Sequence, residues 1–179
     1  MNDKALITDT EFKLSMRRLA GAVSVITVGD GQDRTGFTAT SVSSFSGEPP
    51  SVIVSVNRAS SSWPVLQRYG CFCVNVLAAD QRQVAQSFAG LDGRKGVERY
   101  SDAGWYRLKT GAPVLENALT VLDCELETAF HHHSHAILIG HIRAIEIRQD
   151  IGPLLYWQGD YHDLPAEVHR HRLAEPLRQ

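Results

Sequence analysis

The sequence lacks an excess of charge of either sign and any long apolar run. Its 18 Lys and Arg residues nearly balance 20 Asp and Glu residues, for a formal net charge of −2. Because no basic block is present that would neutralise a run of phosphates, we expect no nucleic-acid partner. Apolar runs such as AILI at 136–139 are too short to cross a bilayer, and the first residues lack the order of a signal peptide. We therefore expect no membrane association and a cytoplasmic location.

Cysteine is also scarce, and several catalytic motifs are missing. The three cysteines, Cys71, Cys73 and Cys124, are an odd number, which fits free thiols in a reducing compartment. The chain has no nucleophile elbow, P-loop or G-x-G-x-x-G, and Cys71 and Cys73 lack the second pair of a zinc site. The absence of repeats and linkers over 179 residues predicts one domain, 1–179, with a core at about 12–164 and a charged tail at 165–179.

The first half of the chain shows helical and strand-like patterns in turn. Thr8 and Glu11 have the spacing of a capping box, and apolar residues at 12, 16, 19 and 20 predict an amphipathic helix. Alternation at 23–28 and a β-prone run at 34–41 predict a hairpin, and the runs at 51–57 and 71–77 predict buried strands on either side of a short helix at 63–69. Asp80 is expected to cap a further helix that Gly90 ends.

The last third carries the longest predicted strands. Even-numbered residues from 118 to 130 share one face of a strand, which leaves Asp123, Glu125 and Glu127 on a face expected to be exposed to water. Strands are also predicted at 136–148 and 153–157. Roughly eight strands with two or three helices predict a mainly β fold, either a barrel or a sandwich.

Polar clusters suggest where a ligand binds. Six of the nine residues at 38–46 carry hydroxyl groups, which suit a planar ligand that has hydrogen-bond donors and acceptors, although a Thr-rich strand entering a Ser-rich loop explains them equally well. Residues 57–62, with three serines and Arg58, precede a predicted helix and are able to hold a phosphate or simply to cap the helix. Asn75 is an amide in a buried strand, so a ligand or a neighbouring strand must satisfy it.

A histidine run at 131–135 raises the question of a metal. Alternate residues of a strand share a face, so His131, His133 and His135 are candidate ligands, with His141 and Glu146 as further ones. The run also lies at a connection between two long strands, where an exposed polar loop is a simpler explanation. We expect no metal site.

Taken in order, several short motifs resemble the flavin reductase-like family, the FMN-binding split barrels that include the reductase components of two-component flavin-dependent monooxygenases. The resemblance runs from about residue 12 to residue 164. The motifs are GFTATSVSSFS at 36–46, SVN at 55–57, FCVNVL at 72–77, SFAG at 87–90, PVL at 113–115, SH at 134–135 and GDYH at 159–162. The resemblance implies a mainly β, split β-barrel of Greek-key type with a few peripheral helices, and a homodimer.

The resemblance also implies the function and the residues that carry it. The chain is expected to be an NAD(P)H:flavin oxidoreductase that transfers hydride from NADH or NADPH to FMN or FAD and supplies reduced flavin to a partner oxygenase. The flavin-binding residues that it implies are Thr38, Ala39, Thr40, Ser41, Asn57, Arg58, Ser60, Ser62, Asn75, Phe88, Ala89, Gly90 and Lys95. Those on the nicotinamide side are His135, Tyr161 and His162, and Tyr161 stands where many relatives have histidine.

Two other classes of function remain open from the sequence. A split-barrel flavoprotein oxidase, similar to pyridoxamine-phosphate oxidases, would keep the fold and use bound flavin to oxidise a substrate. A non-catalytic barrel would bind flavin or a metal ion at the same residues without oxidising NADH. Oxidation of NADH that depends on added flavin would separate the first expectation from both.

Overall fold

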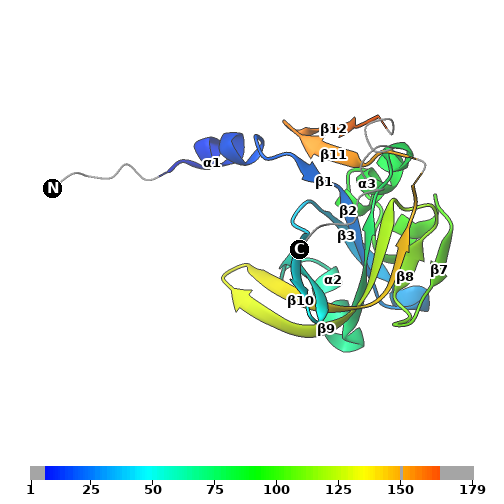
Figure 1. Cartoon of the computed structure of the whole chain (residues 1–179). Coiled ribbons are helices and arrows are strands. Elements are labelled where there is room, and N and C mark those ends of the chain that lie inside the picture. Colours follow the sequence, from blue (N-terminus) through cyan, green and yellow to red (C-terminus); the bar gives the residue numbers. More distant parts are fainter. Residues whose placement is uncertain (1–6, 150, 166–179) are drawn as a thin grey trace.

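A computed structural model describes residues 7–149 and 151–165, and these form a mainly β structure (Figure 1). Its main sheet has seven antiparallel strands in the order β3-β2-β6-β9-β10-β5-β4. A second sheet has the order β1-β11-β12, and β7 and β8 form a small third sheet. Among the described residues no helix is long and apolar enough to cross a membrane.

The strands and helices have the following bounds. The main sheet contains β2 (Ser24–Val28), β3 (Thr35–Ala39), β4 (Ser43–Gly47), β5 (Pro50–Asn57), β6 (Cys71–Val76), β9 (Thr120–His132) and β10 (His135–Ile147). The other strands are β1 (Gly21–Ala22), β7 (Trp105–Arg107), β8 (Pro113–Leu115), β11 (Leu154–Trp157) and β12 (Asp160–Asp163). The α-helices are α1 (Asp9–Met16), α2 (Ser62–Tyr69) and α3 (Arg82–Ala89). The predicted hairpin, central strands and helices are thereby confirmed, whereas β1, β4, β7, β8 and β12 were not predicted.

The central strands are buried on both faces, which explains their nearly continuous apolar character. Along β6, Cys71 and Cys73 lie in one apolar cluster, and Phe72 and Val74 lie in another. The first cluster packs against α3 and the β7–β8 sheet, and the second contains α2. Because side chains alternate across a strand, each central strand contributes to two cores. The three cysteines are free and buried.

Close packing of α3 on β3 depends on Gly36. A Cβ atom there would lie 2.5 Å from the carbonyl oxygen of Ile26 and 2.8 Å from Cε1 of Phe88. Phe88 is fully buried and contacts the ring of Tyr100, whose hydroxyl donates a hydrogen bond of 2.6 Å to the carbonyl oxygen of Thr35. A side chain at position 36 would therefore push α3 away from the strand.

Helix α1 begins with the predicted capping box, but it buries none of its residues. Thr8 Oγ1 accepts a hydrogen bond of 3.2 Å from the Glu11 backbone N–H, and a carboxylate oxygen of Glu11 accepts one from Thr8 N–H. The helix ends at Met16, earlier than the apolar spacing predicts, and it extends away from the body of the molecule (Figure 1). Its apolar face, which includes Phe12 and Met16, is exposed in the described part of the chain.

Two local predictions are wrong. Asp80 does not cap α3 but lies in a preceding 3-10 turn, and the residue before the helix is Gln81. Asp123 does not face water, because the loop that contains Thr110 covers this part of β9. The tail expected at 165–179 lies outside the described residues apart from Pro165.

Candidate functional site

Two hollows meet at the end of β3. The β3–β5 hollow, of about 370 Å³, is lined by Phe37, Thr38, Ala39, Ser41, Ser55, Asn57, Ser60 and His135. The β3–α3 hollow, of about 470 Å³, is lined by Val23, Thr38, Ala39, Thr40, Arg82, Gln86, Ala89, Leu91, Tyr156, Gly159, Asp160 and Tyr161. Thr38 and Ala39 belong to both. The hydroxyl-rich motif that the sequence singles out therefore borders both cavities.

The β3–β5 hollow gathers predicted residues from three separate segments. Thr38, Ala39 and Ser41 come from β3 and the residues after it, Asn57 ends β5 and Ser60 follows it, and His135 begins β10. Pairing of β5 with β10 explains the last position, since His135 lies directly opposite Asn57 in the sheet. The fold thus brings together residues 97 positions apart in sequence, from 38 to 135.

Ser60 has the most informative hydroxyl group in this hollow. Its Oγ atom is buried and has no hydrogen-bond partner among the described residues. Its neighbours are held in place, because the Ser60 N–H donates to the Asn57 carbonyl and the Ala59 N–H donates to Asn57 Oδ1 at 2.9 Å. A buried hydroxyl without a partner is costly, so a polar ligand atom in the hollow would relieve that cost.

Other hydroxyls of the motif already have partners. Thr38 Oγ1 donates a 2.7 Å hydrogen bond to the carbonyl oxygen of Ala85 in α3. Ser41 Oγ donates to the Ser55 carbonyl and accepts from the Ser55 N–H, both at 3.3 Å. These bonds fix the wall of the hollow and leave Ser60 as the hydroxyl that most needs a ligand.

The β3–α3 hollow contains the aromatic groups expected beside a planar ring. Tyr161 and Tyr156 contact each other with ring centroids 5.3 Å apart, and burial raises the pKa of the Tyr161 hydroxyl. The β11–β12 hairpin that carries them pairs with β1 through Tyr156 and Gly21. Tyr161, rather than His162, lines the hollow, while the His162 ring packs against Trp157 with its centroid 5.9 Å away. Alternation along β12 explains why adjacent residues take different sides.

Arg82 and Gln86 line the same hollow and were not predicted. They are four residues apart in α3, so they share one face of the helix, and Ala85 and Phe88 face the core. This spacing was a usable signal in the sequence. Arg82 Nη2 lies 2.7 Å from Asp160 Oδ1, and the N–H of Tyr161 together with Arg82 lowers the pKa of Asp160.

Three predicted flavin contacts lie inside the protein instead. Asn75 is fully buried, its amide donates to Val25 O and Thr27 Oγ1, and its Oδ1 accepts from Leu115 N–H at 2.7 Å. The protein itself therefore satisfies the hydrogen bonds of Asn75. Phe88 is fully buried, and buried Ser62 has its Oγ 3.5 Å from Thr35 Oγ1.

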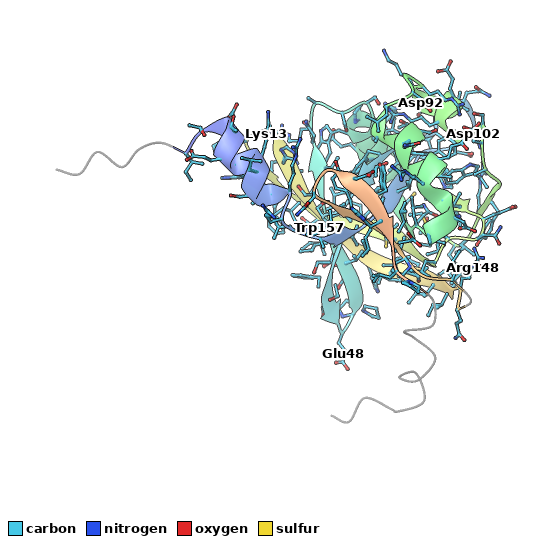
Figure 2. All side chains as sticks on the ribbon, turned by 90° about the horizontal axis from the view of Figure 1, so that it is seen from above. Lys13, Glu48, Asp92, Asp102, Arg148 and Trp157 are labelled. Carbon is cyan, nitrogen blue, oxygen red and sulfur yellow. The ribbon has the colours of Figure 1, made fainter. Side chains whose placement is uncertain are left out.

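Three other predicted residues, Arg58, Gly90 and Lys95, line neither hollow. Arg58 Nη1 donates to the carbonyl of His133 at 3.2 Å, so it supports the β9–β10 turn. Gly90 ends α3 with a positive φ of 77°. Lys95 is exposed in a loop whose ion pairs join Arg94 to Asp92 and to Asp102, two residues seen at the same edge of the molecule in Figure 2.

The histidine run does not form the shared face on which a metal site would depend. The chain turns at residues 133–134, so His135 pairs with His132 and lies on the face opposite to His131. His131 instead contacts the ring of Trp63, with centroids 5.3 Å apart. Within residues 7–149 and 151–165, no group of three His, Cys, Asp or Glu side chains is placed to hold a metal.

Comparison with known proteins gives consistent matches over nearly the whole chain. A family model described as flavin reductase like domain matches residues 16–165. The chain is 36% identical over 166 residues to an FMN reductase (NADH) RutF of Variovorax paradoxus, across 92% of this chain and 90% of that protein.

Solved structures show the same similarity. A putative flavin reductase from Haemophilus somnus superposes with a TM-score of 0.85 at 32% identity, over 88% of this chain and 100% of that one. BorF, the flavin reductase component of a bacterial two-component tryptophan halogenase, superposes with a TM-score of 0.81 at 31% identity, over 88% and 99%.

Proposed function

The chain belongs to the flavin reductase-like family, and from that premise we propose that it is an NAD(P)H:flavin oxidoreductase that uses the two hollows at the end of β3. The flavin is FMN or FAD and the electron donor NADH or NADPH, and the name of the RutF relative favours FMN with NADH. The observation that carries the proposal is the junction of the two hollows at Thr38 and Ala39. Hydride transfer requires the reacting atoms of the two rings to lie about 3–3.5 Å apart, so the rings would have to meet where the hollows share Thr38 and Ala39.

The residues of the chain bind and orient both partners. In the β3–β5 hollow, the orphaned Ser60 hydroxyl and Asn57 offer polar contacts to a flavin, and His135 borders the other side. In the β3–α3 hollow, Tyr156 and Tyr161 present aromatic surface to a nicotinamide ring. The bound flavin and nicotinamide themselves supply the hydride transfer chemistry. The protein's contribution is to hold the rings in contact and exclude water.

The other residues that the resemblance implies have supporting roles in the proposed site. Thr38, Ala39 and Ser41 form the wall beneath the flavin, and Thr40 and Ala89 border the second hollow. Arg58, Gly90 and Lys95 support the rim, where Lys95 is exposed enough to reach a ligand phosphate. His162 supports the hairpin that presents Tyr161.

We propose that the seven-stranded sheet is curved into a split barrel. Strands β3 and β4 are the two edges of the seven-stranded sheet, yet only residues 40–42 separate them in the sequence. The edges of a flat sheet of this width would be roughly 29 Å apart, whereas this link spans at most about 14 Å. The sheet must therefore curl strongly, as a split barrel of Greek-key type does.

The proposal includes a homodimer, a cytoplasmic location and a partner oxygenase that receives reduced flavin. The exposed apolar face of α1 supports the dimer, and three free buried cysteines fit a reducing compartment. The similarity to BorF supports an oxygenase-type partner. An oxidase of the pyridoxamine-phosphate type and a non-catalytic barrel are not favoured, because the matched relatives are named as reductases.

The decisive experiment is a steady-state assay of NADH and NADPH oxidation with FMN, FAD and riboflavin. We expect oxidation above the background rate only when flavin is supplied or retained. Rates equal to the enzyme-free control with every pair of donor and flavin would reject the reductase. Oxidation of a pyridoxamine phosphate by oxygen, without a nicotinamide, would favour the oxidase instead.

A further inference from the structure

Among the described residues that line the β3–α3 hollow, Arg82 is the one cationic side chain. The only other charged lining residue is Asp160, and the remainder are apolar, aromatic or neutral polar. Nucleotide cofactors carry phosphate groups, and a cavity that accepts one needs a positive partner for them. Arg82 is therefore the candidate partner in this hollow.

The position of Arg82 places it at the boundary between two elements. It is the first residue of α3, and its guanidinium reaches the tip of the β11–β12 hairpin, where Nη2 lies 2.7 Å from Asp160 Oδ1. The same guanidinium stands over the ring of Tyr161, with Cζ 5.3 Å from the ring centroid. Arg82 thus lies beside the aromatic side chain proposed to face the nicotinamide.

The ion pair with Asp160 leaves several N–H donors of the Arg82 guanidinium available for a ligand. A guanidinium has five N–H donors, and within the described part of the chain Asp160 Oδ1 is the only oxygen that accepts a hydrogen bond from Arg82. The two side chains are 51% and 63% exposed, so their attraction is screened by water. A phosphate offers a higher charge and two oxygens in the geometry that a guanidinium binds best. Replacement of the Asp160 carboxylate by a phosphate as the partner of the Arg82 guanidinium would consequently be favourable.

We propose that Arg82 binds a phosphate group of a nucleotide cofactor in the β3–α3 hollow and thereby selects phosphate-bearing cofactors. Asp160 orients the guanidinium at the mouth of the hollow until the phosphate displaces it. The inference rests on the proposed function for the identity of the cofactors. Both a nicotinamide dinucleotide and a phosphorylated flavin carry the required group.

The test compares cofactors with and without phosphate in Arg82→Gln and wild-type protein. NADH is compared with 1-benzyl-1,4-dihydronicotinamide as electron donor, and FMN is compared with riboflavin in equilibrium binding followed by flavin fluorescence. Loss of one charge-assisted contact should weaken the phosphate-bearing member roughly tenfold or more relative to the phosphate-free member. A selective change in KM for NADH identifies the dinucleotide as the source, and a selective change in Kd for FMN identifies the flavin.

Arg68→Gln is a matched control. Arg68 also forms a 2.7 Å ion pair, with Asp33, and those side chains are 55% and 45% exposed, but Arg68 lines neither hollow. Its substitution should alter neither cofactor ratio. If Arg82→Gln behaves like Arg68→Gln in both comparisons, the proposal is wrong.

Asp160→Asn distinguishes phosphate binding by Arg82 from a purely structural role, in which the ion pair only stabilises the β11–β12 hairpin. Because this change removes the competing charge, affinity for the phosphate-bearing cofactor should stay equal or improve, by up to about fivefold at low salt. An equal loss of affinity in Arg82→Gln and Asp160→Asn would show that the pair only braces the hairpin, which overturns the proposal. The fluorescence comparison needs no turnover. It therefore tests Arg82 even if the wild-type protein oxidises neither donor and the reductase function fails.

Discussion

At the scale of single residues, hydrogen-bond satisfaction distinguishes ligand contacts from structural groups. Ser60 and Ser62 are both near the start of α2 and look equivalent in the sequence. In the structure, Ser60 Oγ lacks a partner in the described chain and lines a hollow, whereas Ser62 is buried against Thr35. The two serines should therefore respond differently to substitution.

Ser60→Ala should weaken flavin binding without destabilising the protein. Removing a buried hydroxyl that has no partner should leave the free energy of unfolding unchanged or raise it by about 1 kcal/mol. If Ser60 contacts the flavin phosphate, the Kd for FMN should rise by roughly tenfold or more while that for riboflavin changes little. Flavin fluorescence titration and urea unfolding give the two values. Ser62→Ala is the control and should leave the Kd for FMN near that of the wild type.

The histidines should also separate into two groups. His131→Ala removes a ring contact with Trp63, so it should lower the free energy of unfolding by about 0.5–1.5 kcal/mol and leave the KM for NADH unchanged. His135→Ala alters a lining residue of the β3–β5 hollow and should change cofactor binding with little effect on stability. Steady-state kinetics and thermal unfolding distinguish them. Equal losses of activity in both variants, together with a loss of wild-type activity when a chelator is added, would instead indicate a shared metal.

At the scale of secondary-structure elements, a buried carboxyl group attaches a loop to the main sheet. Asp123 in β9 is fully buried, and its Oδ2 accepts a 2.8 Å hydrogen bond from the Thr110 N–H. Its other oxygen accepts from the Thr110 hydroxyl. Burial, with a further contribution from Asp123, raises the pKa of the nearby Cys73 thiol, which keeps that thiol neutral.

Asp123→Ala should destabilise the protein strongly, because it leaves two donors of Thr110 without an acceptor. We expect a loss of about 2–4 kcal/mol in the free energy of unfolding, measured by denaturant titration. Glu125→Ala, two residues along the same strand, is the control. Glu125 forms an exposed ion pair with Arg143, so its loss should cost about 1 kcal/mol or less. Similar losses for the two variants would contradict this account.

At the scale of the whole molecule, the apolar face of α1 is left exposed by the residues that the structure describes, which supports the proposed homodimer. Phe12, Met16 and Leu19 line an open hollow with Thr40, Ser41 and Tyr156, next to both hollows of the candidate site. Figure 1 shows α1 standing away from the sheets, and Figure 2 shows Lys13 of α1 far from Arg148 at the opposite end. A second copy of the chain on this face would bury the helix and border the cofactor site.

Phe12→Ser should weaken the proposed homodimer. Each dimer would lose two buried aromatic side chains, which corresponds to about 3–6 kcal/mol and to at least a hundredfold rise in the dissociation constant. Light scattering after size-exclusion chromatography, over a dilution series, measures the change. Leu14→Ser is the control, because exposed Leu14 does not line the hollow of Phe12 and Met16. Wild-type protein that is monomeric at every concentration would reject the dimer.

The sequence by itself determined the elements whose signals are local. Alternation at 23–28 located β2, and nearly continuous apolar runs located β5 and β6. The Thr8–Glu11 spacing located the start of α1, and Gly90 located the end of α3. These features depend on side chains within a few residues of one another, so the order of residues suffices to predict them. The motif resemblance then named nine of the eighteen residues that line the two hollows.

The tertiary structure alone decided which polar residues are available to a ligand. Asn75 and Asp123 have their hydrogen bonds satisfied by Leu115 and Thr110, segments 40 and 13 residues away, and no local pattern reveals such partners. The turn at 133–134 placed His135 and His131 on opposite faces, and the β11–β12 hairpin brought Asp160 to Arg82 across 78 residues. Burial and hydrogen bonding depend on the atoms that surround a group in space, and strand pairing between distant segments sets those surroundings.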